Sequence, residues 1–149
     1  MILHSLLALA LALVAADAPK DDAKKDLDKL QGMWTIASGK YDGEELDANL
    51  VSKLSFEVKG DQFLIKGDDE VVKQYAKIAL KLDPTAKPKL IDFRVTQGDD
   101  KGNVIEGVYE LDGDEFKICA KLDAKERPTD FKSEENSHTA LIVFKRQGK

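Results

Sequence analysis

The sequence alternates between apolar and polar residues in a succession of short segments, and this two-residue period constrains the fold more than any other feature. Successive side chains of a β-strand point to opposite faces, so such a segment predicts a strand with one buried face. Leu54, Phe56 and Val58 form one segment, and Phe63 and Ile65 continue the pattern after a turn. We predict further strands at residues 33–40, 71–82, 90–96 and 139–146, and a pair flanking residues 111–114.

Glycine-containing turns join two of the predicted strand pairs. Gly60-Asp61 is typical of a type II′ hairpin, because glycine adopts the positive φ required at the first central position. We predict a second two-residue hairpin, of type I′, at Asp112-Gly113. The predicted registers pair Val58 with Phe63, Tyr109 with Phe116, Gly107 with Ile118, Ile105 with Ala120 and, on the outside, Glu110 with Glu115.

Eight predicted strands follow one another with short connections and without long helices between them. Antiparallel neighbours of this kind close into an up-and-down barrel, which removes the exposed edges of a sheet. We therefore predict an all-β fold over residues 30–149, an eight-stranded antiparallel up-and-down β-barrel. Residues 19–29 are predicted to be a charged linker that becomes a short helical plug, with Leu27 and Leu30 against one barrel end.

An apolar run at the N-terminus predicts export. Residues 2–14 are nearly all apolar, and small residues follow at 15–18. The run is too short to span a bilayer, which takes about 20 residues, and it is typical of a secretory signal. Cleavage after Ala16 and cleavage after Ala18 both fit. We predict a signal peptide over residues 1–18, a periplasmic or extracellular protein, and no membrane span after removal of the signal.

Gly32 and Trp34 begin the first predicted strand, and Arg146 ends the last. Glycine allows a sharp entry into the strand, and the indole ring can cover the barrel mouth. These strands are neighbours in a closed barrel, so the guanidinium can lie on the indole, an interaction of about 0.5–2 kcal/mol. We predict that these residues close one barrel end. The pattern resembles the lipocalin superfamily, in which an arginine of the final strand packs on the tryptophan of the first.

From Leu30 onward, the chain also resembles a family of small exported lipocalin-like proteins from planctomycete bacteria. The matching stretches lie at residues 30–34, 82–92, 107–114, 117–119 and 126–131, and in the closing strand with Lys145-Arg146. The resemblance implies a lipocalin-like barrel and brings no established activity. The chain lacks the long helix that full lipocalins carry after their last strand.

Composition argues against several functional classes. The formal net charge is −5 and the lysines are mixed among acids, which disfavours nucleic acid and anionic membrane surfaces as partners. Cys119 is the only cysteine, so it is predicted to be a packed free thiol, with a covalent dimer as the alternative. His138 is the only histidine after the predicted signal and is expected to be a solvated loop residue, with a haem ligand as the alternative. We expect no enzyme activity, no metal and no cofactor.

The loop around residues 126–131 is the strongest candidate for a binding site. Arg127 offers a planar fork for a carboxylate or phosphate, and Pro128 stiffens the chain beside it. We favour a structural interpretation over this binding role, in which Arg127 pairs with a barrel carboxylate and Phe131 packs the loop onto the barrel. The candidate ligand- or partner-binding residues are Glu126, Arg127, Thr129, Phe131 and Tyr109.

Bulky side chains on the inward face predict a mostly filled barrel, with an open ligand cup as the alternative. The inward set is Trp34, Ile36, Phe56, Phe63, Ile65, Ile78, Ile91, Phe93, Tyr109, Phe116, Ile118 and Phe144. We predict a monomeric, non-catalytic, exported barrel that binds a small apolar or amphiphilic ligand. The alternative is a closed-core structural or protein-interaction domain of the cell envelope that uses its loops.

Overall fold

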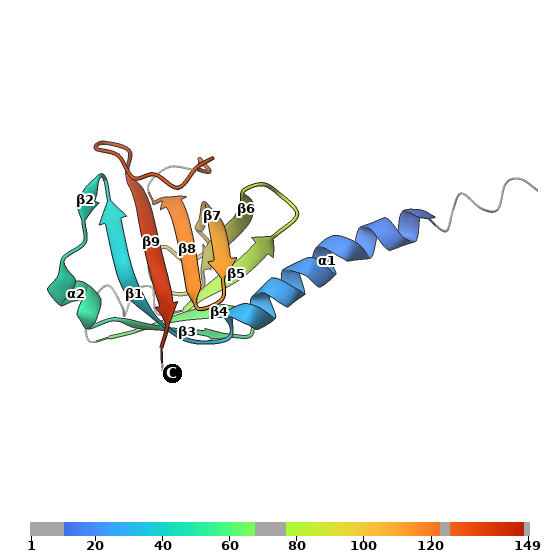
Figure 1. The fold of residues 1–149 in the computed structure, drawn as a ribbon, viewed down its shortest axis with the longest axis horizontal. Coiled ribbons are helices and arrows are strands. Elements are labelled where there is room, and N and C mark those ends of the chain that lie inside the picture. The colour runs from blue at the N-terminus through green and yellow to red at the C-terminus, as the bar shows by residue number, and fades with distance from the viewer. Residues whose placement is uncertain (1–10, 68–76, 123–125, 148–149) are drawn as a thin grey trace, which may run out of the picture.

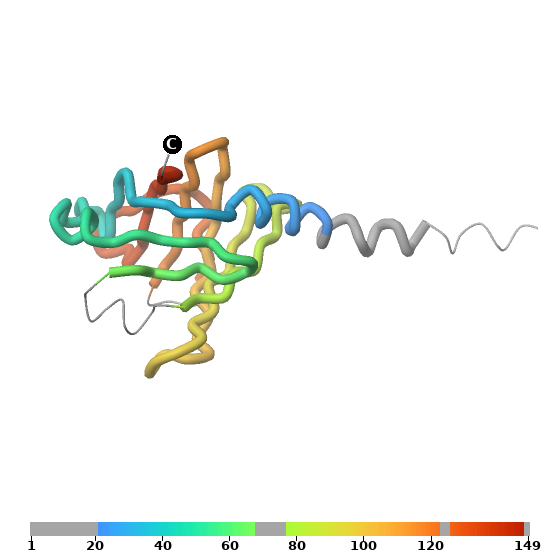
Figure 2. The backbone as a smooth tube through the Cα atoms, turned by 90° about the horizontal axis from the view of Figure 1, so that it is seen from below, coloured from blue at the N-terminus to red at the C-terminus, as the bar shows by residue number. Residues whose placement is uncertain are grey.

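A computed structural model describes residues 11–67, 77–122 and 126–147. The helices are α1 (Leu11–Leu30) and α2 (Ala48–Ser52). The strands are β1 (Gly32–Tyr41), β2 (Glu44–Glu45), β3 (Ser55–Lys59), β4 (Gln62–Lys66), β5 (Lys77–Asp83), β6 (Lys89–Val95), β7 (Val104–Asp112), β8 (Glu115–Lys121) and β9 (Thr139–Arg146). In both Figure 1 and Figure 2, α1 leaves one side of the barrel and α2 lies on the opposite side.

The strands form a closed antiparallel barrel with sequential neighbours. The order is β1-β3-β4-β5-β6-β7-β8-β9, and the pairing of β1 with β9 closes the ring of eight. Among the described strands, the two-residue strand β2 pairs only with β1, through a turn in which Asp42 and Gly43 have φ values of 55° and 82°. The prediction of an eight-stranded up-and-down barrel is confirmed.

Most of the predicted strands occur where the alternation places them. The strand predicted at 139–146 is β9, and the strand predicted at 90–96 is β6, displaced by one residue. The strand predicted at 71–82 corresponds to β5, which begins at Lys77. The first part of that prediction, up to residue 76, lies outside the described residues.

The β3–β4 hairpin has the predicted register, whereas the β7–β8 hairpin differs from its prediction. Val58 lies opposite Phe63, and Gly60 has a φ of 63°. In β7–β8 the central turn residues are Gly113 and Asp114, and only Gly113 has a positive φ, of 58°. The predicted type I′ turn at Asp112-Gly113 is therefore wrong by one position.

This correction moves every partner in the β7–β8 pair by two residues. Tyr109 lies opposite Ile118, Gly107 opposite Ala120, Leu111 opposite Phe116 and Glu110 opposite Lys117. The side-chain period of a strand is two, so the shift leaves the inward and outward faces unchanged. It replaces the predicted pairing of Glu110 with Glu115 by an ion pair to Lys117, with 3.3 Å between nitrogen and oxygen.

Aromatic side chains fill the centre of the barrel. The rings of Phe56 and Phe144 lie 5.0 Å apart edge to face, and Phe144 also stacks on Phe116 at 5.6 Å. Edge-to-face and offset contacts of this kind add to the free energy gained from burial. The buried interior residues include Trp34, Phe56, Phe63, Ile78, Ile91, Phe93, Tyr109, Phe116, Ile118 and Phe144, whereas Ile36 and Ile65 are partly buried. The predicted inward set thus forms a buried aromatic core within the closed barrel.

Helix α1 is longer than the predicted plug at residues 19–29, because it begins at Leu11. Its last turn packs on the barrel end, where Leu30 is fully buried and Leu27 is partly buried. The terminal carbonyls of a helix have no partner within the helix. Here Trp34 Nε1 donates to Leu30 O at 2.8 Å, and the Arg146 guanidinium donates to Lys29 O at 2.5 Å. Two side chains of the barrel thus cap the helix.

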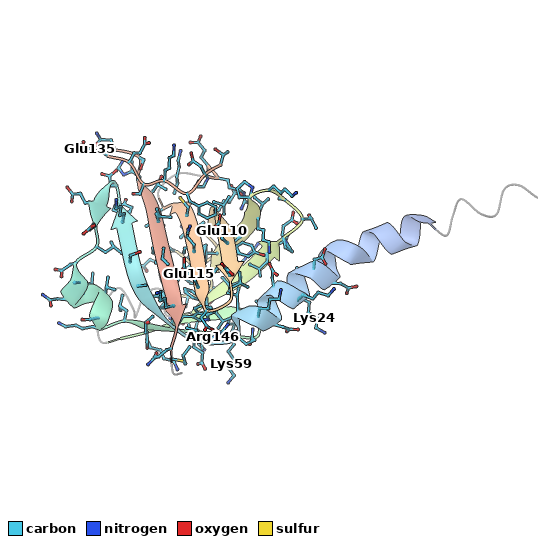
Figure 3. The ribbon with its side chains drawn as sticks, viewed as in Figure 1. Lys24, Lys59, Glu110, Glu115, Glu135 and Arg146 are labelled. Atoms are coloured by element: carbon cyan, nitrogen blue, oxygen red, sulfur yellow. The ribbon has the colours of Figure 1, made fainter. Side chains whose placement is uncertain are left out.

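The predicted stack of arginine on tryptophan is present at the same place. The Arg146 guanidinium lies 4.3 Å from the centre of the Trp34 ring, and Trp34 is fully buried. Figure 3 places Arg146 and Glu135 toward opposite ends of β9. Gln31 makes a third link, because its side-chain amide exchanges two 2.8 Å hydrogen bonds with the backbone of Gly60 in the β3–β4 turn.

Candidate functional site

Residues 126–138, which precede β9, fold back over the outside of the barrel. Val108 and Cys119 lie opposite each other on the outer face, yet both are buried. The Cys119 thiol donates to the carbonyl of Lys132 at 3.5 Å, and burial raises the pKa of that thiol. The loop therefore forms a second, smaller packed layer outside the barrel wall.

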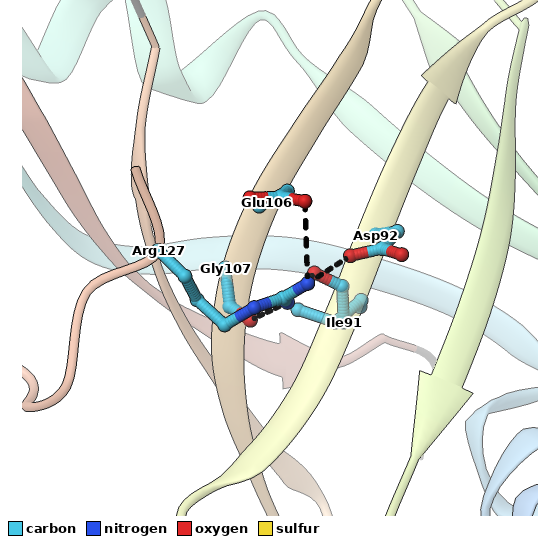
Figure 4. Close-up of polar contacts among 5 residues, drawn as sticks. All are labelled: Ile91, Asp92, Glu106, Gly107 and Arg127. Atoms are coloured by element: carbon cyan, nitrogen blue, oxygen red, sulfur yellow. Dashed lines mark hydrogen bonds and ion pairs between the residues drawn. The ribbon is translucent and has the colours of Figure 1, made fainter. Parts of the chain in front are cut away.

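Arg127 anchors this loop to two barrel strands (Figure 4). Its guanidinium donates to the carbonyl of Gly107 at 2.7 Å and to that of Ile91 at 3.2 Å. It also pairs with Asp92 at 2.7 Å and lies 3.7 Å from Glu106. Charge-assisted hydrogen bonds of this length are among the stronger ones in proteins. The geometry matches the structural alternative, in which Arg127 pairs with a barrel carboxylate.

Of the other candidate residues in the loop, two lie beside Arg127 and one does not. Glu126 and Thr129 are exposed and share a polar groove of about 300 Å³ with Arg127. Glu126 pairs with Lys121 at 3.1 Å. Phe131 is not part of the groove lining; its ring faces Lys117, whose ammonium lies 5.4 Å from the ring centre.

Tyr109 lies apart from the loop, inside the barrel end covered by α1. Its hydroxyl donates to Asp26 at 2.7 Å, and the Lys89 ammonium donates to the same carboxylate oxygen at 2.9 Å. Burial and the nearby carboxylate raise the pKa of Tyr109. Burial acts to raise the pKa of Asp26, but hydrogen bonds from Tyr109 and Lys89 and the Lys89 charge outweigh it and lower that pKa.

The contribution of Asp26 was missed in the sequence, where residues 19–29 looked like a solvated linker. Asp26 is only 6% exposed and joins α1 to β6 and β7. Its spacing was the available signal, because Asp26 and Leu30 are four residues apart and share one helix face. The sequence carries no comparable signal for Lys89.

Within the described ranges, no three His, Cys, Asp or Glu side chains gather in a way that could hold a metal ion. His138 is exposed, and its backbone N–H donates to Asp42 at 3.0 Å. Among those same residues, no helix is both long and apolar enough to cross a bilayer.

Apolar grooves also lie on the described surface of the barrel, and two of them bear on the function. The first, the α1–β5 groove, has a volume of about 600 Å³ and is lined by Ala23, Lys24, Leu27, Leu80, Lys81, Leu82, Asp83 and Thr85. The second, the α2 groove, has a volume of about 440 Å³ and runs between α2, β1 and β9. Neither groove coincides with the loop predicted as the binding site.

Comparison with protein-family models finds no match, and neither the curated proteins nor the solved structures contain a significant one.

Proposed function

We propose that this protein is an exported, non-catalytic interaction domain with a closed core, which recognises its partner through its outer surface. The observation that carries the proposal is the aromatic cluster at the barrel centre, where Phe144 contacts both Phe56 and Phe116. A ligand held in the usual place for a small barrel would have to displace these rings. The stack of Arg146 on Trp34 supports a lipocalin-like ancestry for the scaffold.

Uptake of benzene tests whether the core is closed. We expect wild-type protein to show no saturable shift of its interior methyl NMR signals, such as those of Ile91, on addition of benzene. Phe63→Ala, with Phe63→Leu as a milder variant, should create an apolar cavity that binds benzene and so serves as the positive control. Saturable binding inside the wild-type barrel would contradict the proposal.

A second candidate function, binding of a small amphiphilic ligand, is favoured by the α1–β5 groove. Ala23, Leu27 and Leu80 give that groove an apolar surface, and Lys24, which projects from α1 (Figure 3), adds a cation to its lining. Laurate is a suitable probe, followed by calorimetry. Binding that Ala23→Trp abolishes would favour this candidate, and laurate binding unaffected by the substitution would exclude the groove as its site.

Export is proposed from the apolar N-terminal run and is tested separately. The mature protein, isolated from a bacterial envelope fraction, should begin at Asp17 or at Pro19, the residues that follow Ala16 and Ala18. N-terminal sequencing distinguishes the two cleavage sites. A mature protein that retains Met1 would contradict export by a cleaved signal.

A further inference from the structure

We propose that a gap beside β1 binds an extended polypeptide segment as an added strand. β1 pairs with β9 along most of its length. Its other side pairs with β3 only at residues 32–34 and with β2 only at residues 40–41. In the described part of the chain, no strand pairs with residues 35–39 on that side. Figure 1 shows β2 and α2 on the side of β1 that faces away from β9.

The gap directly adjoins the backbone pairing between β1 and β2. Beyond β2, the backbone N–H of Leu46 donates to the carbonyl of Gly39 at 2.9 Å. The chain then turns away into α2, whose N-terminus is capped by Asp47. A β-bulge between Ile36 and Ser38 interrupts the regular register at the same place. Bulges often mark sheet edges, so a guest strand would extend an incomplete ladder rather than displace a complete one.

The α2 groove opens on this gap. Ala37 and Ser38, which are small and exposed, line its floor, whereas the Leu46 side chain already packs against Gly39. Leu46 and Val51 contribute apolar side chains on the side of the gap, and Leu141 and Val143 of β9 line the groove on the other side of β1. Beside them on α2, Leu50 is 45% exposed. The groove thus offers apolar contacts next to a strand edge.

A strand edge selects a polypeptide over other apolar ligands. Its alternating N–H and C=O groups match another backbone, whereas an acyl chain cannot form these hydrogen bonds. Because the Gly39 carbonyl already accepts from Leu46, the gap open to a guest spans the four residues 35–38, or roughly 13 Å at the rise of a β-strand. The occupant is therefore a short extended segment with apolar side chains at alternate positions. This inference rests on the proposed function, because it identifies the partner as another protein.

Acidic side chains lie at one end of the gap, and they predict the charge of the guest strand at that end. Glu44, Glu45 and Asp47 are exposed there, with Lys40 as the neighbouring cation. β2 and β3, on the same side of β1, both run antiparallel to it. A guest strand that also runs antiparallel to β1 would have its N-terminus at the acidic end. We therefore expect a basic residue on the N-terminal side of the apolar segment.

Selection from a displayed random heptapeptide library tests the site. Wild-type protein should enrich sequences that alternate apolar and polar residues behind a basic residue. Ser38→Trp fills the floor of the groove from an exposed position, and Arg94→Trp is the matched control on the exposed face of β6. Enriched peptides should lose at least tenfold in affinity with Ser38→Trp and stay within twofold with Arg94→Trp. Failure to enrich any Ser38-dependent peptide would overturn the inference.

N-methylation of the enriched peptide separates strand addition from simple apolar contact. Methylated backbone amides cannot donate hydrogen bonds, so binding should fall at least tenfold although the side chains are unchanged. Equal affinity of both peptides would overturn the added strand. Glu44→Lys combined with Glu45→Lys should weaken binding about fivefold, whereas Glu115→Lys, at the α1 end, should not. Benzene uptake remains the separate test of the closed core, so the two proposals can fail independently.

Discussion

Arg127, a candidate binding residue in the sequence, makes its polar contacts within the chain. Its partners come from β6 and β7, which lie 35 and 20 residues away from it in the sequence. Its charge is already matched by Asp92 and Glu106. An external anion would have to compete with both carboxylates, which favours the structural role.

Arg127→Ala should loosen the loop and expose the thiol beneath it. We expect a loss of about 1–3 kcal/mol in unfolding free energy, because Asp92 and two strand carbonyls lose their charged donor. Cys119 should react faster with a thiol reagent than in wild type, while Arg94→Ala should change neither quantity. An unchanged thiol reaction rate in a folded Arg127→Ala protein would contradict the role of this residue as the loop anchor.

Trp34 and Arg146 jointly close the barrel beneath α1. Trp34→Ala should cost roughly 3–5 kcal/mol, because it removes a large core side chain. Arg146→Ala should cost less, since the arginine is partly exposed, but more than Lys145→Ala on the exposed face. Chemical denaturation measures all three.

Fluorescence gives an independent check, because Trp34 is the only tryptophan. The native emission should be blue-shifted and should move to the red on unfolding. Native emission typical of a solvated indole would contradict closure of the barrel at this end.

At the scale of the elements, the turn of the β7–β8 hairpin requires a residue that can adopt a positive φ. Gly113 occupies the first central position with a φ of 58°, and Asp112 belongs to the strand. Positive φ is costly for a β-branched residue. The corrected turn therefore places the conformational requirement on one residue instead of two.

Gly113→Val should destabilise the protein by about 1 kcal/mol or more. Asp112→Thr should be neutral or slightly stabilising, because Asp112 lies opposite Glu115 and β-branched residues suit strands. Thermal melting of the two variants distinguishes the observed turn from the one predicted at Asp112-Gly113. A large loss of stability with Asp112→Thr would favour the predicted turn instead.

At the level of the whole molecule, a buried carboxylate couples α1 to the barrel. Asp26 comes from the helix, Lys89 from β6 and Tyr109 from β7. Because the pKa of Asp26 is lowered in the fold, its carboxylate stabilises the protein fully at pH values above 3.8, the ordinary pKa of an aspartate. That stabilisation is lost as the pH falls through the lower pKa of the folded state.

Asp26→Asn should therefore reduce stability at neutral pH and flatten the acid limb of the stability profile. Asp28→Asn, at an exposed position on the same helix, is the control and should leave the profile unchanged. Denaturant unfolding at a series of pH values from neutral into the acid range measures both. An acid limb equally steep in wild type and Asp26→Asn would show that the carboxylate does not link α1 to the barrel.

Local patterns in the sequence determined the barrel. Alternation of apolar residues marks the buried face of each strand, and glycine marks turns that need a positive φ, so both can be recognised without knowledge of distant contacts. The β7–β8 register escaped this reasoning because a shift of two residues preserves every face. This register depends on the positive φ of Gly113 in the turn and on the ion pair between Glu110 and Lys117, and both are realised only when the two strands pair.

Only the tertiary structure decided which contacts the candidate site residues make. Arg127 and Asp92 are 35 residues apart, and Tyr109 and Asp26 are 83 apart. Partners this distant depend on how the strands and α1 are placed in space, which no local pattern encodes. The same holds for the gap beside β1, because it exists only where β2 and β3 both stop short of residues 35–39.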